Sequence, residues 1–223
     1  MSDFLYPFLE GAEDDSDALL DDLIASARDK ALISRDLRLA TLERLDAQVR
    51  ATAAAMASRL RDGGQVFAFG NGGSSTDAAG LVTLFTRPPS GPALPARSLV
   101  DDSAVLTALG NDVGFELVFS RQLIAHARPV DVAVGFSTSG NSEDLLVAFS
   151  QAKEKGLLTV GLAGYDGGDM GRAGLDHCLV VTSDSVHRIQ ETQAAVSAAL
   201  WRAVRAELEG APPVAATTGD ENG

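Results

Sequence analysis

The spacing of apolar positions divides the chain into a helical first part and a mixed second part. Between residues 16 and 61 apolar side chains recur three and four positions apart, from Leu19 to Met56, which predicts helix throughout. We expect two helices here, with a break near Ser34. A helical stretch of this length has to pack its apolar stripe on the rest of the domain or on another chain, so an oligomer is expected.

After Gly63 the pattern changes to short apolar runs that alternate with amphipathic segments. Strands are expected over residues 65–70, 97–100, 131–136, 157–163 and 177–182. Helices are expected over residues 75–85, 103–109, 115–127, 143–155 and 185–209. Strands separated by helices indicate a mostly parallel sheet that is covered on both faces. The fold class is therefore α/β, a three-layer doubly wound sheet with an N-terminal helical extension.

Composition supports a single domain. The 223 residues, 45% of them hydrophobic, suffice for one α/β core, which we place at residues 16–209. Residues 1–15, which are acidic, and residues 210–223 show no clear period and are expected to be mobile and disordered. Docking of a protein partner through Phe4, Tyr6 and Phe8 is the alternative interpretation of the N-terminal segment.

The charge limits the kinds of partner. A net charge of −13 argues against nucleic acid and anionic membrane surfaces, both of which select basic patches. No apolar run approaches the length of a membrane span, and the acidic N-terminus lacks the apolar region of a signal peptide. The single cysteine, Cys178, lies in an apolar run and fits a reducing compartment. We expect a soluble, cytoplasmic protein.

Residues 134–144 hold the densest group of hydroxyls that follows a predicted strand. Ser137, Thr138, Ser139 and Ser142 offer four hydroxyls within six residues, and Gly140 lets backbone amides approach a ligand. The helix that follows adds free N–H groups and the positive end of its dipole, so the stretch is typical of a phosphate site. The alternative is a serine-rich turn that only caps the helix, and carboxylates in the first turn would satisfy the same dipole.

A second polar loop, Gly70-Asn-Gly-Gly-Ser-Ser-Thr-Asp77, follows the first expected strand. It lacks the third glycine of a dinucleotide fingerprint and the lysine of a Walker loop. A capping box from Ser74 to Asp77 would explain these two residues but not the glycines after Asn71, which indicate close approach to the backbone. Two such loops without lysine or arginine at one sheet edge fit a sugar phosphate better than a nucleoside triphosphate.

Six ordered strings carry a resemblance to a known family. The chain resembles bacterial sedoheptulose-7-phosphate isomerases, the phosphoheptose isomerase branch of sugar isomerase (SIS) domains, over about residues 35–208. The strings are Gly-Asn-Gly-Gly-Ser (70–74), Leu-Gly-Asn-Asp-Val-Gly-Phe (109–115), Phe-Ser-Arg-Gln (119–122), Ser-Thr-Ser-Gly-Asn-Ser (137–142), Gly-Tyr-Asp-Gly-Gly-Asp-Met (164–170) and Arg-Ile-Gln-Glu (188–191). The resemblance implies a five-stranded parallel sheet, a homotetramer and active sites between subunits.

The resemblance also implies a set of ligand-binding residues. Asn71, Gly72 and Ser74 would contact the sugar, and Asp102 and Gln190 would add polar contacts. The phosphate would be held by the four hydroxyls of residues 137–142, namely Ser137, Thr138, Ser139 and Ser142.

The positions that correspond to the family's acid/base pair differ. The glutamate of the resembling isomerases falls at Leu84 and their histidine at Ala198; a further zinc-binding histidine of some members falls at Gly80. One remaining ligand, Gln190, cannot hold zinc, so neither a metal nor another cofactor is expected.

We therefore expect a phosphosugar-binding protein without catalysis, acting as a sensor or scaffold. The alternative is an active isomerase on sedoheptulose 7-phosphate or a related sugar, with substitute acid/base residues. His187 and Glu191, one helical turn apart, are the weak candidates for that role. An exposed pair at the start of the last helix is the simpler interpretation of these two residues.

Overall fold

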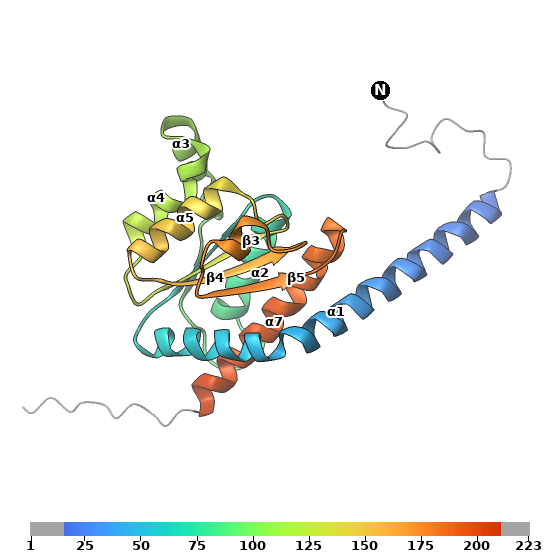
Figure 1. Ribbon diagram of the computed structural model, residues 1–223, viewed down its shortest axis with the longest axis horizontal. Coiled ribbons are helices and arrows are strands. Elements are labelled where there is room, and N and C mark those ends of the chain that lie inside the picture. Colours follow the sequence, from blue (N-terminus) through green and yellow to red (C-terminus); the bar gives the residue numbers. More distant parts are fainter. Residues whose placement is uncertain (1–15, 211–223) are drawn as a thin grey trace, which may run out of the picture.

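A computed structural model describes residues 16–210. The predictions of mobile termini and of a docking segment at Phe4, Tyr6 and Phe8 lie outside the described residues, apart from Gly210, which ends the last helix. The α/β fold class is confirmed: a five-stranded parallel sheet lies between two layers of helices (Figure 1).

The first helix, α1 (Ser16–Arg61), is continuous over 46 residues, so the expected break near Ser34 is wrong. No glycine or proline interrupts the segment, and Ser34 is buried, which leaves nothing to stop the helix there. Its second half buries Leu45, Val49 and Met56. Its first half runs away from the sheet, as Figure 1 shows in blue, and leaves Leu20 and Leu23 exposed.

The sheet is formed by buried apolar strands. In sequence order they are β1 (Val66–Gly70), β2 (Ala96–Ser98), β3 (Val132–Ser137), β4 (Leu158–Gly164) and β5 (His177–Val181). Their order across the sheet is β2-β1-β3-β4-β5, and every pair is parallel. All residues of β1, β3 and β4 are buried, as expected for strands covered on both faces.

Helices cover both faces of the sheet. Beyond α1 they are α2 (Gly73–Thr86), α3 (Ser103–Asp112), α4 (Val118–His126), α5 (Glu143–Glu154), α6 (Gly168–Arg172) and α7 (Val186–Gly210), with a 3-10 turn η2 (Phe115–Leu117) before α4. One apolar core joins α1, α2 and α7 to the sheet, and the other joins α4 and α5 to the opposite face. The predicted helix at 115–127 thus begins as a 3-10 turn, and α6, too short to show a period, was not predicted.

The strand order locates the crevice where ligands bind in such sheets. The chain moves outward from β1 to β2, then returns to β3 and continues in the opposite direction through β4 and β5. In open α/β sheets the ligand site lies at this reversal, outside the carboxyl ends of the central strands. Here these ends are those of β1 and β3, and the two polar loops follow them directly.

None of the helices within residues 16–210 is both long enough and apolar enough to cross a membrane.

Candidate functional site

The two polar loops are tied together by one side-chain contact. Gly70 at the end of β1 pairs with Phe136 in β3, so the loops start side by side. The amide Nδ2 of Asn71 then donates to both carboxylate oxygens of Asp144, at 3.0 and 2.9 Å. Asp144 lies in the first turn of α5 and is almost fully buried. Burial raises the pKa of its carboxyl group, against the hydrogen bond from Asn71, which lowers it.

The serines of the second loop form a cluster. The hydroxyl of Ser137 lies 3.1 Å from that of Ser142 and 3.5 Å from that of Ser139. The backbone N–H of Gly140 donates to Ser137 Oγ at 3.0 Å, and that of Asn141 donates to Ser139 Oγ at 3.2 Å. Gly140 has φ +69°, a conformation that glycine adopts without strain. We call residues 137–142 the cradle loop.

The N-terminus of α5 has no side-chain cap. Ser142 is at the N-cap position, yet its hydroxyl makes no capping hydrogen bond and lies beside Ser137 instead. Of the two first-turn carboxylates, that of Asp144 accepts from Asn71, and Glu143 is exposed. This arrangement differs from a serine-rich turn that only caps its helix.

The glycine-rich loop also leads into a helix without a side-chain cap. Helix α2 begins at Gly73 with Gly72 as its N-cap residue, so the alternative interpretation of Ser74 and Asp77 as a capping box is wrong. Ser74 lies inside the first turn, where it is buried and its N–H donates to the carbonyl of Asn71 at 2.9 Å. The N-termini of α2 and α5 therefore both open at the carboxyl ends of β1 and β3.

Gln190 joins this group from α7. A Cβ added to Gly73 would collide with Nε2 of Gln190, so the amide of Gln190 lies directly against the backbone at the start of α2. The structure thus brings together most of the residues implied by the resemblance: Asn71, Gly72, Ser74, Ser137, Thr138, Ser139, Ser142 and Gln190.

Asp77, which the sequence offered only as part of a capping box, has a perturbed carboxyl group. It lies one helical turn after Gly73, on the edge of α2 that faces α7. Burial raises the pKa of its carboxyl group from 3.8 to about 6. Its Oδ2 atom is buried and has no hydrogen-bond partner among the described residues. The spacing of four residues puts Asp77 on the same face of the helix as Gly73, and this could be read from the sequence. The burial that raises the pKa of Asp77 could not.

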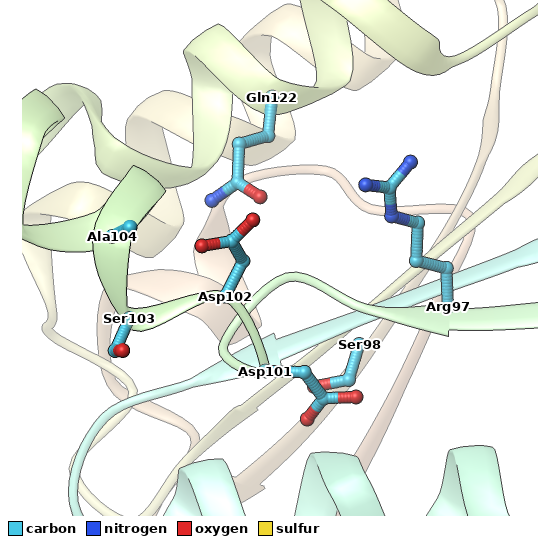
Figure 2. A pocket seen from close by; sticks show the side chains of 7 residues that line it. All are labelled: Arg97, Ser98, Asp101, Asp102, Ser103, Ala104 and Gln122. Atoms are coloured by element: carbon cyan, nitrogen blue, oxygen red, sulfur yellow. The ribbon is translucent and has the colours of Figure 1, made fainter.

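Asp102 lies at the same sheet edge, beyond β2. Its Oδ1 atom accepts from the N–H of Val105 at 3.0 Å and so caps α3. Together with Arg97, Asp101 and Gln122 it lines an open hollow of about 400 Å³ at the edge of the sheet. Figure 2 shows the carboxylate of Asp102 pointing toward Gln122, and Arg97 rising from β2.

His187 and Glu191 lie at the start of α7. Both side chains are exposed in the first turns of α7, and no hydrogen bond or ion pair is recorded between them. Glu191 instead lines a hollow with Lys30, Ser34 and Arg38 of α1. The structure therefore directs Glu191 toward α1.

The donor set does not fit zinc. Of the four positions implied by the resemblance, Gly80, Leu84 and Ala198 have no donor atom, and Gln190 offers a single amide oxygen. Leu84 packs against the core of α1, α2 and α7. Within residues 16–210 no three His, Cys, Asp or Glu side chains lie close enough together to hold a metal ion.

Comparison with known proteins identifies relatives over most of the chain. Residues 34–164 match the model of the SIS domain. The phosphoheptose isomerase of Solidesulfovibrio magneticus is 45% identical over 162 residues, which cover 70% of this chain and 76% of that protein. The phosphoheptose isomerase of Burkholderia pseudomallei is 44% identical over 151 residues, 67% of this chain and 76% of that protein.

Solved structures of phosphoheptose isomerases are similar to this chain over most of its length. A phosphoheptose isomerase from Neisseria gonorrhoeae has a TM-score of 0.74 at 34% identity, with 84% of this chain and 99% of that chain covered. A phosphoheptose isomerase from Francisella tularensis has a TM-score of 0.77 at 29% identity, with 81% and 97% covered.

These relatives overturn the expectation of a protein that binds a phosphosugar without catalysis. That expectation gave decisive weight to Leu84 and Ala198, whereas identity of 40% to 45% extends over most of the chain and the similar proteins are isomerases. A proton can be moved by a different carboxylate in the same crevice, so two side-chain differences do not establish a loss of chemistry.

Proposed function

Because the chain belongs to the SIS domain family and groups within it with the phosphoheptose isomerases, we propose that it is an aldose–ketose isomerase of a sugar phosphate. Sedoheptulose 7-phosphate is the first substrate to test, since the similar enzymes are named for a heptose phosphate. The observation that carries the proposal is the meeting of two uncapped helix N-termini and three serine hydroxyls in one crevice.

The phosphate is assigned to the cradle loop. The hydroxyls of Ser137, Ser139 and Ser142, with Thr138 beside them, supply donors, and the free N–H groups of α5 supply more. A protein with a net charge of −13 repels anions at long range, so these local dipoles have to do the binding. The absence of a basic residue from the loop limits the charge that it can hold and favours one phosphate group over a triphosphate.

The sugar chain is assigned to the β1 side of the crevice. Asn71, Gly72 and Ser74 lie there, with Gln190 of α7 facing them. Asp144 fixes the amide of Asn71 and leaves the amide oxygen free to accept from a sugar hydroxyl. Asp102, which follows β2, is assigned a polar contact with the sugar at the periphery of the site.

Asp77 is our candidate for the base. Isomerisation of a ketose requires removal of a proton from the carbon beside the carbonyl and its return to the former carbonyl carbon, through an enediol. Burial brings the pKa of Asp77 to about 6, close to the pH at which a base must both accept and release a proton. Its buried Oδ2 atom has no hydrogen-bond partner among the described residues, so no donor within them would have to be displaced before it accepts a proton. His187 and Glu191, which are exposed, rank second.

Assembly of several copies is part of the proposal. The first half of α1 carries Leu20, Leu23 and Ile24 at helical spacing, and all three are exposed. We infer that another copy covers this stripe, in a homotetramer with sites at subunit interfaces. A mass measured by light scattering at the monomer value would contradict this. A cytoplasmic setting is inferred from the unpaired Cys178.

The test of the proposed function is turnover of two matched sugars. Purified protein should convert sedoheptulose 7-phosphate to the aldose and should leave unphosphorylated sedoheptulose almost unchanged, because only the first can use the cradle loop. Equal rates on both sugars would show that the cradle loop does not bind the phosphate of the substrate. No conversion of either would overturn the proposed activity.

A further inference from the structure

One residue beside the cradle loop has a backbone conformation that its side chain does not favour. Within residues 16–210, Tyr165 is the only residue other than glycine with a positive φ, +51°. Bulky side chains rarely adopt this left-handed conformation because Cβ approaches the backbone. Such outliers persist where the surrounding structure enforces them, and they concentrate at binding sites.

The strain arises from a tight turn at the carboxyl end of β4. The N–H of Gly167 donates to the carbonyl of Gly164 at 2.8 Å, which makes Tyr165 the first inner residue of the turn. In a turn that starts with a positive φ, this position normally holds glycine, asparagine or aspartate. The chain has glycine at 164, 167 and 168, on both sides of Tyr165, yet a tyrosine where glycine would fit best.

The turn is fastened to the cradle loop. The N–H of Met170 donates to the carbonyl of Gly140 at 2.8 Å, and the N–H of Asp169 donates to Oδ1 of Asn141 at 2.8 Å. A Cβ added to Gly164 would collide with the carbonyl of Thr138, so the turn begins against the middle of the cradle loop. Tyr165 therefore cannot change position without the loop that we assign to the phosphate.

The side chain of Tyr165 is only partly buried. It is 37% exposed, and its hydroxyl has no recorded hydrogen bond to any residue from 16 to 210. A buried aromatic side chain could offset backbone strain through packing, but this one is partly open to solvent. The hydroxyl is therefore a donor without a partner, on a turn that is fastened to the cradle loop.

We propose that Tyr165 is a ligand-binding residue whose phenol hydroxyl donates to a phosphate oxygen of the sugar phosphate in the cradle loop. This inference rests on the proposed function, since it takes that loop as the phosphate site. Hydrogen bonds to charged oxygens are the stronger kind, so the loss of this one should be measurable. The turn that carries Tyr165 follows β4, and the glycine-rich loop with Asn71 follows β1, on the other side of β3.

Two variants separate this role from a structural one. Tyr165→Phe keeps the ring and the strain and removes only the hydroxyl, and it should weaken binding by about tenfold with an unchanged melting temperature. Tyr165→Gly relieves the strain as well, and it should bind at least as weakly while melting at or above the wild-type temperature. A residue that serves the fold would instead lower the melting temperature when replaced by glycine.

The probe is sedoheptulitol 7-phosphate, the reduced sugar, which cannot isomerise, titrated by calorimetry. Wild-type affinity in both variants would overturn the inference, and a change in oligomeric mass at constant affinity would make Tyr165 an interface residue instead. A Ser139→Ala, Ser142→Ala variant tests the cradle loop separately. If it loses binding and the Tyr165 variants do not, the inference fails alone. No binding by the wild type overturns both.

Discussion

Asn71 donates through one amide nitrogen to both carboxylate oxygens of Asp144, across 73 residues of sequence, and thereby holds the ends of β1 and β3 together above the sheet. The contact sets the width of the crevice between the glycine-rich loop and the cradle loop. The carboxylate of Asp144 also lies against backbone N–H groups in the first turn of α5, which together with Asn71 lower its pKa against the effect of burial.

Removal of one partner should therefore affect the fold and the site together. Asn71→Ala leaves a buried carboxylate without its donor and should lower the free energy of unfolding by about 1 to 3 kcal/mol. Asp144→Asn removes the buried charge and keeps a possible amide pair, so it should cost less. Chemical denaturation of both variants and of an Asn71→Ala, Asp144→Ala double variant measures the coupling. Strictly additive effects would contradict a direct pair.

The serines of the cradle loop should matter for binding far more than for folding. Loss of two hydroxyls in Ser139→Ala, Ser142→Ala should weaken binding of sugar phosphate by about 100-fold or more, because hydrogen bonds to an anion are worth about 1.5 to 3 kcal/mol each. Calorimetry with sedoheptulitol 7-phosphate gives the affinity and a thermal melt gives the stability. Ser150 is exposed on α5, the helix that follows the cradle loop. Ser150→Ala is therefore the matched control and should change neither the affinity nor the stability.

The raised pKa of Asp77 predicts a dependence of stability on pH with a definite sign. Its pKa of about 6 in the fold exceeds the ordinary 3.8, so ionisation destabilises the folded state and stability falls as pH rises through this range. Asp77→Asn cannot ionise. We expect this variant to melt about 3 to 6 °C above the wild type at pH 8 and to lose that advantage near pH 4.

The variant that gains stability should lose catalytic activity. If Asp77 is the base, Asp77→Asn lowers kcat by a factor of about 100 to 10,000 while the fold becomes more stable. The exposed Asp62→Asn, at the end of α1, controls for the loss of one charge and should leave both unchanged. If the difference in melting temperature between Asp77→Asn and the wild type is the same at pH 4 and at pH 8, Asp77 is not buried as described.

Two glycines on α2 provide a matched pair. A Cβ at Gly73 displaces the amide of Gln190, whereas a Cβ at Gly80 meets nothing within 4 Å. Gly80→Ala should therefore stabilise the helix by about 0.5 to 1 kcal/mol and leave kcat/KM as it is. Gly73→Ala should lower kcat/KM without a comparable loss of stability, because the end of a flexible side chain can move. Equal kcat/KM in the two variants would remove Gln190 from the site.

The elements of the fold were predictable because each has a local signature. The five residues of β1 are apolar or glycine and buried throughout, and the serines at 137, 139 and 142 follow a strand and precede a helix, so both the sheet and the cradle loop could be placed from sequence. The continuity of α1 was misjudged because Ser34 is a weak helix former that tertiary packing tolerates.

The chemistry of the site was harder to predict because it depends on distant residues. The pKa of Asp77 comes from burial between α2 and α7, and the contact of Asn71 with Asp144 joins separate loops, so neither has a signature in the sequence. The expectation of lost catalysis failed for a related reason. It compared single positions, Leu84 and Ala198, whereas the similarity to isomerases extends over most of the chain.

The most direct test of the account is proton exchange at the reacting carbon. Purified protein is incubated with sedoheptulose 7-phosphate in deuterated buffer, and NMR follows both the aldose and the C1 protons of the ketose. We expect the aldose to form and deuterium to enter at C1, both lost in Asp77→Asn and both retained in Asp62→Asn. Neither product nor exchange with the wild-type protein would contradict the proposed isomerase, and undiminished exchange in Asp77→Asn would contradict the assignment of the base.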